Sequence, residues 1–325
     1  MKESDFDYVG VLDSKYILKL KLWDGVSSSV YKSFDNFSKV EYAIKVFDDT
    51  SSFERERSIN EIISKSQKPF FVKYISSSSG YLDIGETHEL KKYIIFEFYP
   101  KGDLFELINA NSEGLQEQNC KVIAYKIILA IQALHKMGIC HLDIKPENIL
   151  IFGDNFEIKI GDFGVSSSIY RNNEKVLQSG DVGTYGYKAP EIIEGKVFDG
   201  EKADVFSFGV LLFVLLIGIK PFPTAEIIDH GSNVQKLYRY IIKDSDNYWN
   251  FLKIMGLTGL SLEFKKLFIR MVAYDPNERP TIEEILDDDW FKVITNLKEE
   301  EFKKYEEKLI IELKEREDMI KKEKS

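Results

Sequence analysis

Two short stretches of the chain contain the residue types that are best suited to do chemistry together. Residues 141–150 read HLDIKPENIL, and residues 162–164 read DFG. Four of their residues, Asp143, Asp162, Lys145 and Asn148, supply two carboxylates, one amine and one amide. Carboxylate and amide oxygens suit a hard cation such as Mg²⁺, a carboxylate can take up a hydroxyl proton, and an amine can offset phosphate charge. Transfer of a phosphoryl group from a metal-bound nucleotide needs this combination of groups.

Both stretches closely resemble the catalytic loop and the metal-binding loop of eukaryotic protein kinases. The resemblance implies that Asp143 orients or deprotonates the incoming hydroxyl and that Lys145 reaches the γ-phosphate of ATP. It also implies that Asn148 and Asp162 bind Mg²⁺. The sequence after Asp143 is similar to the serine/threonine-directed form of the loop, as is Thr184, whose hydroxyl would bridge Asp143 and Lys145.

A turn that could cover a nucleotide lies between the apolar–polar strands expected within residues 16–46, and the strand expected at 42–45 carries Lys45. In kinases a G-x-G-x-x-G-x-V loop covers ATP, and the lysine holds its α and β phosphates. The four corresponding positions here are Trp23, Gly25, Ser28 and Val30. Because glycine lets bare backbone approach a phosphate, we expect Gly25 and Lys45 to bind ATP, less tightly than with all three glycines.

The resemblance also assigns residues to the adenosine part of ATP. The adenine ring would be enclosed by three apolar side chains, those of Val30, Ala43 and Leu150. Phe96 would be the gatekeeper, and the backbone from Glu97 to Tyr99 would form the hinge that hydrogen-bonds to adenine. Asp103 would contact the ribose. Its type and position also fit a helix N-cap before Leu104, and the two roles can coexist.

A charged helix expected at residues 53–66 should supply a glutamate partner for Lys45. One side of the helix carries three isoleucines, Ile59, Ile62 and Ile63. We prefer Glu56, because it shares a helix face with Ile59 and Ile63. Glu61 has the more usual separation from Lys45 and is the alternative, and a third interpretation makes both glutamates solvated charges.

Three further family positions lie after the metal-binding loop. Residues 183–191 read GTYGYKAPE and resemble the substrate-binding end of a kinase activation segment. Asp204, which precedes an apolar helix expected at residues 206–219, matches the internal anchor of the catalytic-loop backbone. Glu191 and Arg279 match an ion pair that holds the activation segment on the helical lobe, so we expect them to be buried together.

Leu142 departs from the arginine that commonly precedes the catalytic aspartate in kinases. An arginine there can pair with a phosphate on the activation loop, whereas leucine cannot. Similar loops occur among calmodulin-dependent and myosin-light-chain-type kinases. We therefore expect activity that does not depend on a loop phosphate read by residue 142, and Ser179 is the natural candidate phosphosite.

Composition narrows the class of protein. The 325 residues are 44% hydrophobic and 30% charged, with a formal net charge of −10, which disfavours a nucleic-acid partner. The two cysteines, Cys120 and Cys140, are too few for a disulfide framework and favour a reducing compartment. The polar first residues do not read as a signal peptide, and the apolar run at 206–219 is shorter than the ~20 residues of a membrane span. We expect a soluble cytoplasmic protein, with access to the nucleus left open.

The resemblance covers about residues 14–291 and implies the α+β, two-lobed protein kinase fold, with ATP and Mg²⁺ as cofactors and Ser/Thr proteins as substrates. The N-terminal antiparallel β lobe would be residues 14–98 and the helical C-terminal lobe 99–291, after a polar leader at 1–13. We expect strands at 70–75 and 93–98 on either side of a Ser-Gly turn, and a long helix at 117–138.

The charged helical tail, residues 292–325, has four apolar residues at helical spacing, which are Phe302, Tyr305, Leu309 and Leu313. We expect a solvated helix that is frayed in part. The alternatives are a helix that packs on the domain and one that captures a regulatory partner.

Two other functions compete with an active kinase. A catalytically weak kinase-like scaffold has Trp23 and Ser28 in its favour, and a small-molecule or lipid kinase is disfavoured by the 183–191 segment. A P-loop enzyme is excluded because its GxxxxGK[ST] motif does not occur in the sequence.

Overall fold

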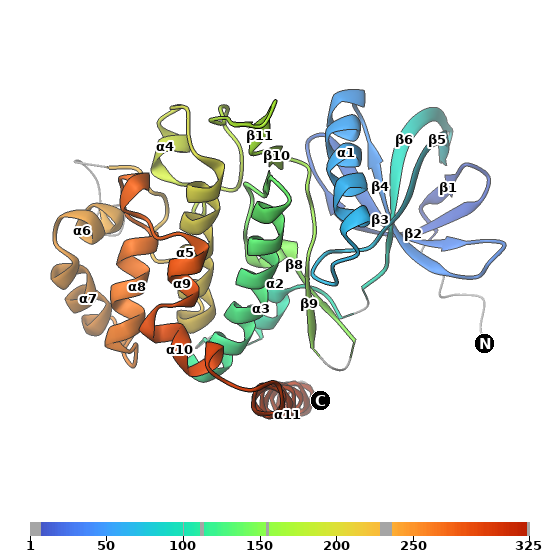
Figure 1. The fold of residues 1–325 in the computed structure, drawn as a ribbon. Helices are drawn as coiled ribbons and strands as arrows, with labels where there is room; N and C mark the ends of the chain where they lie inside the picture. The colour runs from blue at the N-terminus through green and yellow to red at the C-terminus, as the bar shows by residue number, and fades with distance from the viewer. Residues whose placement is uncertain (1–7, 100, 111–113, 154–155, 228–235, 324–325) are drawn as a thin grey trace. The chain divides into compact units, whose positions relative to one another are not determined.

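The computed structural model describes residues 8–99, 101–110, 114–153, 156–227 and 236–323, and the first seven residues of the expected leader and the last two of the tail lie outside this part. The chain forms two compact units (Figure 1). One is Met1–Pro100 with Asp162–Gly164, and the other is Lys101–Gly161 with Val165–Ser325. The first is built on antiparallel strands and the second mainly on helices, which confirms the α+β class.

The first unit is a closed antiparallel barrel with strand order β1-β2-β3-β4-β6-β5. Its strands are β1 (Gly10–Leu12), β2 (Tyr16–Asp24), β3 (Ser28–Asp35), β4 (Glu41–Phe47), β5 (Tyr74–Ile84) and β6 (Thr87–Glu97). Alternate side chains along these strands point into the barrel. Leu18, Tyr31, Ile44 and Ile95 are among the buried residues that fill it. Helix α1 (Thr50–Ser66) begins at Asp49, whose carboxylate accepts a hydrogen bond from the Ser52 N–H.

Two expectations for this unit are wrong. Residues 10–12, which we assigned to the polar leader, form strand β1, which pairs with both β2 and β5. The Ser-Gly stretch at 76–80 is the middle of strand β5, and the chain turns at Gly85 instead, where φ is 56°. Pairing with β6 along the whole of Ser76–Gly80 outweighs the weak strand propensity of serine and glycine. Gly80 is also required by space, since a Cβ there would lie 2.7 Å from the Asp13 side chain.

The second unit contains helices and short strand pairs. Its helices are α2 (Leu104–Asn109), α3 (Glu117–Lys136), α4 (Pro190–Ile193), α5 (Gly200–Ile217), α6 (Leu237–Lys243), α7 (Ser245–Ile254), α8 (Leu262–Met271), α9 (Ile282–Leu286), α10 (Asp289–Thr295) and α11 (Glu299–Glu323), with 3₁₀ turns η1 (Pro146–Asn148) and η2 (Pro276–Glu278). Its strands pair as β7 (Ile139–Cys140) with β10 (Ser167–Ser168), β8 (Ile149–Phe152) with β9 (Glu157–Ile160), and β11 (Tyr170–Arg171) with β12 (Glu174–Lys175).

Helix α5 is the core of this unit. Nearly all of its side chains are buried, as a helix that is apolar on every side must be. It begins earlier than the expected residue 206, because Asp199 caps it, and it ends at Gly218, whose φ of 82° stops the helix. Helix α3 packs beside it with Ile127, Ile131 and other apolar residues fully buried. Within the described residues, no helix combines the length and the apolar character that crossing a membrane requires.

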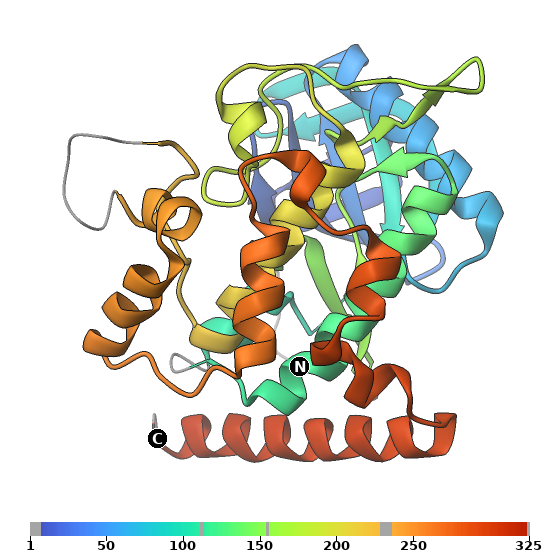
Figure 2. The same cartoon turned by 60° about the vertical axis from the view of Figure 1, so that its left-hand side comes forward.

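The C-terminal tail packs on the second unit, so the expected solvated and frayed tail is wrong for residues 302–313. Figure 2 shows α11 as a long red helix. Leu309 and Leu313 are buried, and the Phe302 ring meets the Tyr125 ring of α3 at 5.4 Å. An ion pair of 2.7 Å between Lys126 and Glu306 fixes the same contact. The apolar stripe of the tail therefore faces its own chain.

Candidate active site

One face of the barrel carries three of the residues expected to hold ATP. Val30 on β3 is paired directly with Lys45 on β4, and directly paired residues project their side chains to the same face. Ala43 lies two residues before Lys45 on β4, so it projects to that face as well. The alternation of side chains along β3 and β4 thus brings Val30, Ala43 and Lys45 together.

Lys45 is buried and lies between two carboxylates of the same unit. Its Nζ is 2.7 Å from Oε2 of Glu56 and 2.8 Å from Oδ1 of Asp162. Burial alone lowers the pKa of Lys45, but the negative charges of Asp162 and Glu56 more than offset this, so the pKa lies above its ordinary value. Burial raises the pKa of the Glu56 carboxyl above its ordinary value.

The choice between the two helix glutamates follows from how α1 packs. Glu56 is buried on the same side as Ile59 and Ile63. Glu61 instead pairs with Arg57 at 2.8 Å on the solvent side of the helix. Ile62, which we placed on the buried side, is 46% exposed. The structure therefore pairs Lys45 with Glu56 and not with Glu61.

The Asp-Phe-Gly segment lies in a narrow space beside Lys45 and Glu56. Oδ1 of Asp162 accepts hydrogen bonds from Lys45 Nζ at 2.8 Å and from the Gly164 N–H at 3.3 Å. A Cβ on Gly164 would come within 3.2 Å of both Asp162 and Glu56. Phe163 is buried, with its ring 6.2 Å from that of Phe71. Glycine at 164 thus leaves room for the three charged side chains to meet.

Hydrogen bonds fix the expected hinge residues at the end of β6. The Tyr99 hydroxyl donates to Oε1 of Glu97 at 2.6 Å, and the same oxygen accepts the Lys73 N–H at 3.0 Å. The Glu97 N–H donates to the Lys73 carbonyl at 3.1 Å. These bonds fix the backbone of Glu97 through its N–H and join the side chains of Glu97 and Tyr99.

In the second unit, three of the expected catalytic residues form one hydrogen-bonded group. The Thr184 hydroxyl donates to Oδ1 of Asp143 at 2.7 Å and accepts a hydrogen bond from Lys145 Nζ at 2.7 Å. Lys145 Nζ also lies 2.9 Å from Oδ2 of Asp143. The carboxylate of Asp143 is therefore held on both oxygens, and the bridge expected for Thr184 is present.

Asn148 completes this group through its amide nitrogen. Nδ2 donates to the Asp143 carbonyl at 2.7 Å and to Oδ2 of Asp143 at 3.2 Å. Because Nδ2 makes both bonds, the carbonyl oxygen Oδ1 of Asn148 is the atom that could bind a cation. Across the part of the chain that the structure describes, no group of three or more His, Cys, Asp or Glu side chains gathers as a metal site. An ion held here would depend on amide and water oxygens as well, which is typical of Mg²⁺.

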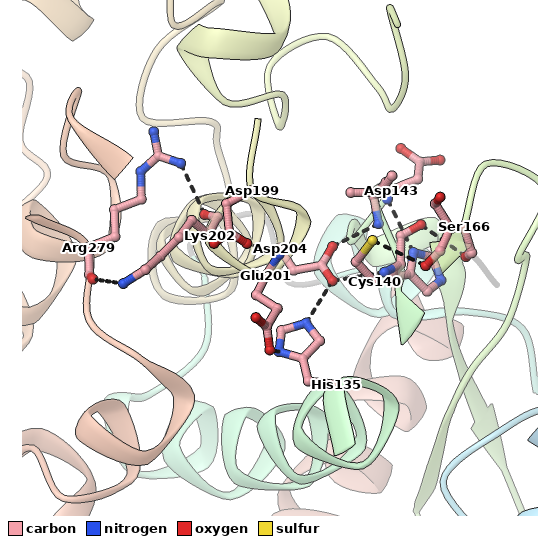
Figure 3. A network of polar contacts seen from close by, with 12 residues as sticks. His135, Cys140, Asp143, Ser166, Asp199, Glu201, Lys202, Asp204 and Arg279 are labelled. Carbon is pink, nitrogen blue, oxygen red and sulfur yellow. Dashed lines mark hydrogen bonds and ion pairs between the residues drawn. The ribbon is translucent and has the colours of Figure 1, made fainter. Parts of the chain in front are cut away.

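Asp204 anchors the catalytic-loop backbone, as expected (Figure 3). Its Oδ2 accepts the His141 N–H at 2.8 Å, and its Oδ1 accepts the Leu142 N–H at 2.7 Å. His135, at the end of α3, also contacts Oδ2 through Nε2 at 2.9 Å. His135 could not be predicted from the sequence, because a lone histidine near a helix end shows no link to a residue 69 positions further on.

His141 has a structural role in this network. Nε2 donates to the Gly161 carbonyl at 3.0 Å, and Nδ1 accepts the Asp143 N–H at 3.2 Å, so the proton is assigned to Nε2. The neighbouring Cys140 is fully buried, with Sγ 3.2 Å from the Ser167 carbonyl, and burial raises the pKa of its thiol. Burial also raises the pKa of the Cys120 thiol.

Glu191 and Arg279 form a buried bidentate ion pair, as expected. Nη1 and Nη2 of Arg279 donate to the two carboxylate oxygens of Glu191 at 2.7 and 2.6 Å. Arg279 also donates to the backbone carbonyls of Lys202 and Ala273 at 3.0 and 2.9 Å. Every charge of the pair is therefore hydrogen-bonded inside the unit.

Asp103 and Leu150 lie side by side in the second unit, joined by an isolated β-bridge. The Asp103 carboxylate accepts the Glu106 N–H at 2.9 Å and so caps helix α2. Partial burial raises the pKa of Asp103 above its ordinary value. The N-cap role that residue type allowed is thus present, and its role toward ribose stays a prediction.

Comparisons with known proteins agree with this geometry. The family model for the protein kinase domain matches residues 16–291. CBL-interacting serine/threonine-protein kinase 20 of Arabidopsis thaliana is 31% identical over 290 residues, which cover 87% of this chain and 60% of that protein. CBL-interacting protein kinase 5 of Oryza sativa subsp. japonica is 30% identical over 285 residues, with 87% and 57% covered. The chain thus spans about 60% or less of the length of these curated relatives.

Proposed function

Since the chain belongs to the protein kinase domain family, we propose that it is a serine/threonine protein kinase. It transfers the γ-phosphate of Mg-ATP to Ser or Thr hydroxyls of protein substrates. The observation that carries the proposal is the group in which Thr184 bridges Asp143 and Lys145 at 2.7 Å to each. A carboxylate held on both oxygens beside an ammonium is prepared to act on a hydroxyl and a phosphate.

Asp143 accepts the proton of the substrate hydroxyl, or orients that hydroxyl for attack. Its carboxylate is kept in position by three side chains, those of Thr184, Lys145 and Asn148. Lys145 offsets the charge that develops on the γ-phosphate during transfer. Positioning and charge neutralisation are the main demands of this reaction, and these four side chains meet both.

The proposed nucleotide contacts begin with the phosphates. Lys45, oriented by Glu56, binds the α and β phosphates, and Gly25 lets the loop backbone approach them. The adenosine contacts are Val30, Ala43, Glu97, Tyr99, Leu150 and, for the ribose, Asp103. The first two share the barrel face of Lys45, which supports their role beside the same ligand.

Asn148 and Asp162 are the residues that would hold Mg²⁺. Both offer hard oxygen ligands. Because Asn148 makes its two hydrogen bonds to Asp143 through Nδ2, its Oδ1 is left for the metal ion. Bound magnesium would neutralise phosphate charge.

We further propose Ser/Thr-containing proteins as substrates, with no nucleic-acid partner, given the net charge of −10. A regulatory protein partner for residues 292–325 would be in line with relatives that are named for interacting with CBL. Two free, buried cysteines fit the reducing conditions of the cytoplasm, with access to the nucleus left open.

The test is phosphate transfer from Mg-ATP to a Ser/Thr peptide library by the purified protein and by the Asp143→Asn variant. We expect Asp143→Asn to lose roughly 10²–10⁴ in rate, the usual contribution of a proton-handling group. Asp246→Asn, a surface substitution in α7, is the matched control and should behave as the wild type. Equal transfer by wild type and Asp143→Asn, or none by either, would contradict the proposal.

A further inference from the structure

Trp23 lies on the nucleotide-binding face of the barrel. It is paired directly with Val30 across β2 and β3, and Val30 is paired directly with Lys45 across β3 and β4. Directly paired residues share a face of the sheet. Trp23, Val30 and Lys45 therefore form a row of side chains across three strands, with the indole at one end and the ammonium at the other.

The indole of Trp23 extends past Val30 and contacts Lys45. Lys45 Nζ lies 5.8 Å from the centroid of the Trp23 ring, within the range of a cation–π contact. Lys45 is only 6% exposed, whereas Trp23 is 48% exposed. The half-exposed indole thus lies against the cation and not in the barrel core.

Gly25 is what allows the indole to take this position. A Cβ at residue 25 would lie 1.7 Å from Cη2 of Trp23, and other atoms of the six-membered ring would be within 2.5 Å. The ring therefore packs directly on the bare backbone of the turn. The only glycine kept in the nucleotide-covering loop is also the one that lets Trp23 fold over it.

We propose that Trp23 sets the nucleotide affinity of this chain by competing with the phosphates for Lys45. The phosphates of the nucleotide must displace the indole before they can reach the ammonium. A phosphate and an indole face both attract a cation, and a contact that the nucleotide must break in order to bind weakens its apparent affinity. This inference rests on the proposed function, because it takes Lys45 as the phosphate-binding residue.

The experiment is the dissociation constant of Mg-ADP, measured by titration calorimetry on the full chain and on single variants. We expect Trp23→Ala to bind Mg-ADP about threefold to tenfold more tightly, as loss of one cation–π contact predicts. Trp23→Phe keeps a smaller aromatic face and should fall between Trp23→Ala and the wild type. Val26→Ala is the control in the same turn, since Val26 is fully exposed, and it should leave the affinity unchanged.

Tryptophan fluorescence gives a second readout of the same movement. Trp290 is fully buried in the other unit, and Trp249→Phe removes the third indole. In this background Mg-ADP should change the emission of Trp23, and the added Trp23→Phe substitution should abolish that change.

The outcomes separate the inference from the proposed function. If the wild type binds Mg-ADP and Trp23→Ala binds equally or more weakly, the inference is wrong while the proposed function stands. Binding by Trp23→Ala alone would support the inference in its strongest form. If neither protein binds Mg-ADP, both the inference and the proposed function are overturned.

Discussion

Asp204 holds the backbone of Leu142 in a left-handed conformation. Its Oδ1 accepts the Leu142 N–H at 2.7 Å, and Leu142 has a φ of 67°. A non-glycine residue in that region costs roughly 1–3 kcal/mol and persists only where the surroundings impose it. Asp143, the proposed catalytic residue, comes next, so this strained position sets the direction in which Asp143 leaves the loop.

Replacement of Asp204 by asparagine should lower kcat. An asparagine side chain has one acceptor oxygen where two N–H groups need one each, so one of the two backbone anchors is lost. We expect a decrease of about tenfold or more, which corresponds to 1.4 kcal/mol of activation free energy. Steady-state kinetics with saturating Mg-ATP would measure it. Asp199→Asn on the same helix keeps an N-cap residue and should retain activity, and a similar loss in both variants would contradict the anchor role.

Glu56→Gln and Glu61→Gln should have different effects on ATP use. Glu56 pairs with buried Lys45, whereas Glu61 pairs with Arg57 at the surface. We expect kcat/KM for ATP to fall about tenfold or more in Glu56→Gln, and to stay near the wild-type value in Glu61→Gln. If Glu61→Gln is the more damaging of the two, the assignment of Glu56 is wrong.

The buried pair of Glu191 and Arg279 should matter far more for stability than a surface pair. Arg279→Met leaves the Glu191 charge uncompensated inside the unit, so the free energy of unfolding should drop by about 3–5 kcal/mol. Arg270→Met breaks the exposed pair with Asp288, at 3.1 Å, and should cost less than about 1 kcal/mol. Urea denaturation of both variants would measure the difference, and equal midpoints would count against a structural role for the buried pair.

The tail helix offers a matched set of leucine and isoleucine positions. Leu309 and Leu313 are 1% and 6% exposed, whereas Ile311 on the same helix is 56% exposed. Leu309→Ala and Leu313→Ala should each lower the free energy of unfolding by about 2 kcal/mol or more, and Ile311→Ala by no more than about 0.5 kcal/mol. Thermal denaturation gives the ranking. A tail that leaves the unit in solution would make all three substitutions equally mild.

Ser179→Ala should leave turnover largely intact. Ser179 is exposed, but Leu142, the residue that would have to read a phosphate on the loop, is apolar and buried. Thr184→Ala removes a hydrogen bond to Asp143 and should lower kcat about tenfold or more. Kinase assays on purified protein would compare the two. Loss of turnover in Ser179→Ala alone would mean that loop phosphorylation is required after all.

Local sequence was enough to predict the parts of the site that depend on spacing. The loop with Asp143, Lys145 and Asn148, the Asp162 segment and the α+β class could be predicted because short motifs resemble those of protein kinases. Glu56 could be preferred over Glu61 because three- and four-residue spacing shows which side of a helix faces the core. The same spacing wrongly placed Ile62 with Ile59 and Ile63, since the buried stripe of α1 is too narrow to include all three isoleucines.

Features that depend on distant segments could not be predicted in this way. The serines and glycine of β5 form a strand because β6 supplies their pairing partners, which no local propensity records. Burial of Leu309 requires α3 to be present beside it. His135 is linked to the catalytic loop only through Asp204, and both residues come together by packing of α3 on α5.

Burial of both cysteines has a practical consequence for chemical labelling. Thiol reagents attack the accessible thiolate, and Cys120 and Cys140 are fully covered with pKa values that burial raises. The native protein should therefore react slowly with maleimides. A single cysteine introduced at an exposed position such as Val26 or Ile254 would carry a fluorescent dye or spin label without removal of the natural cysteines.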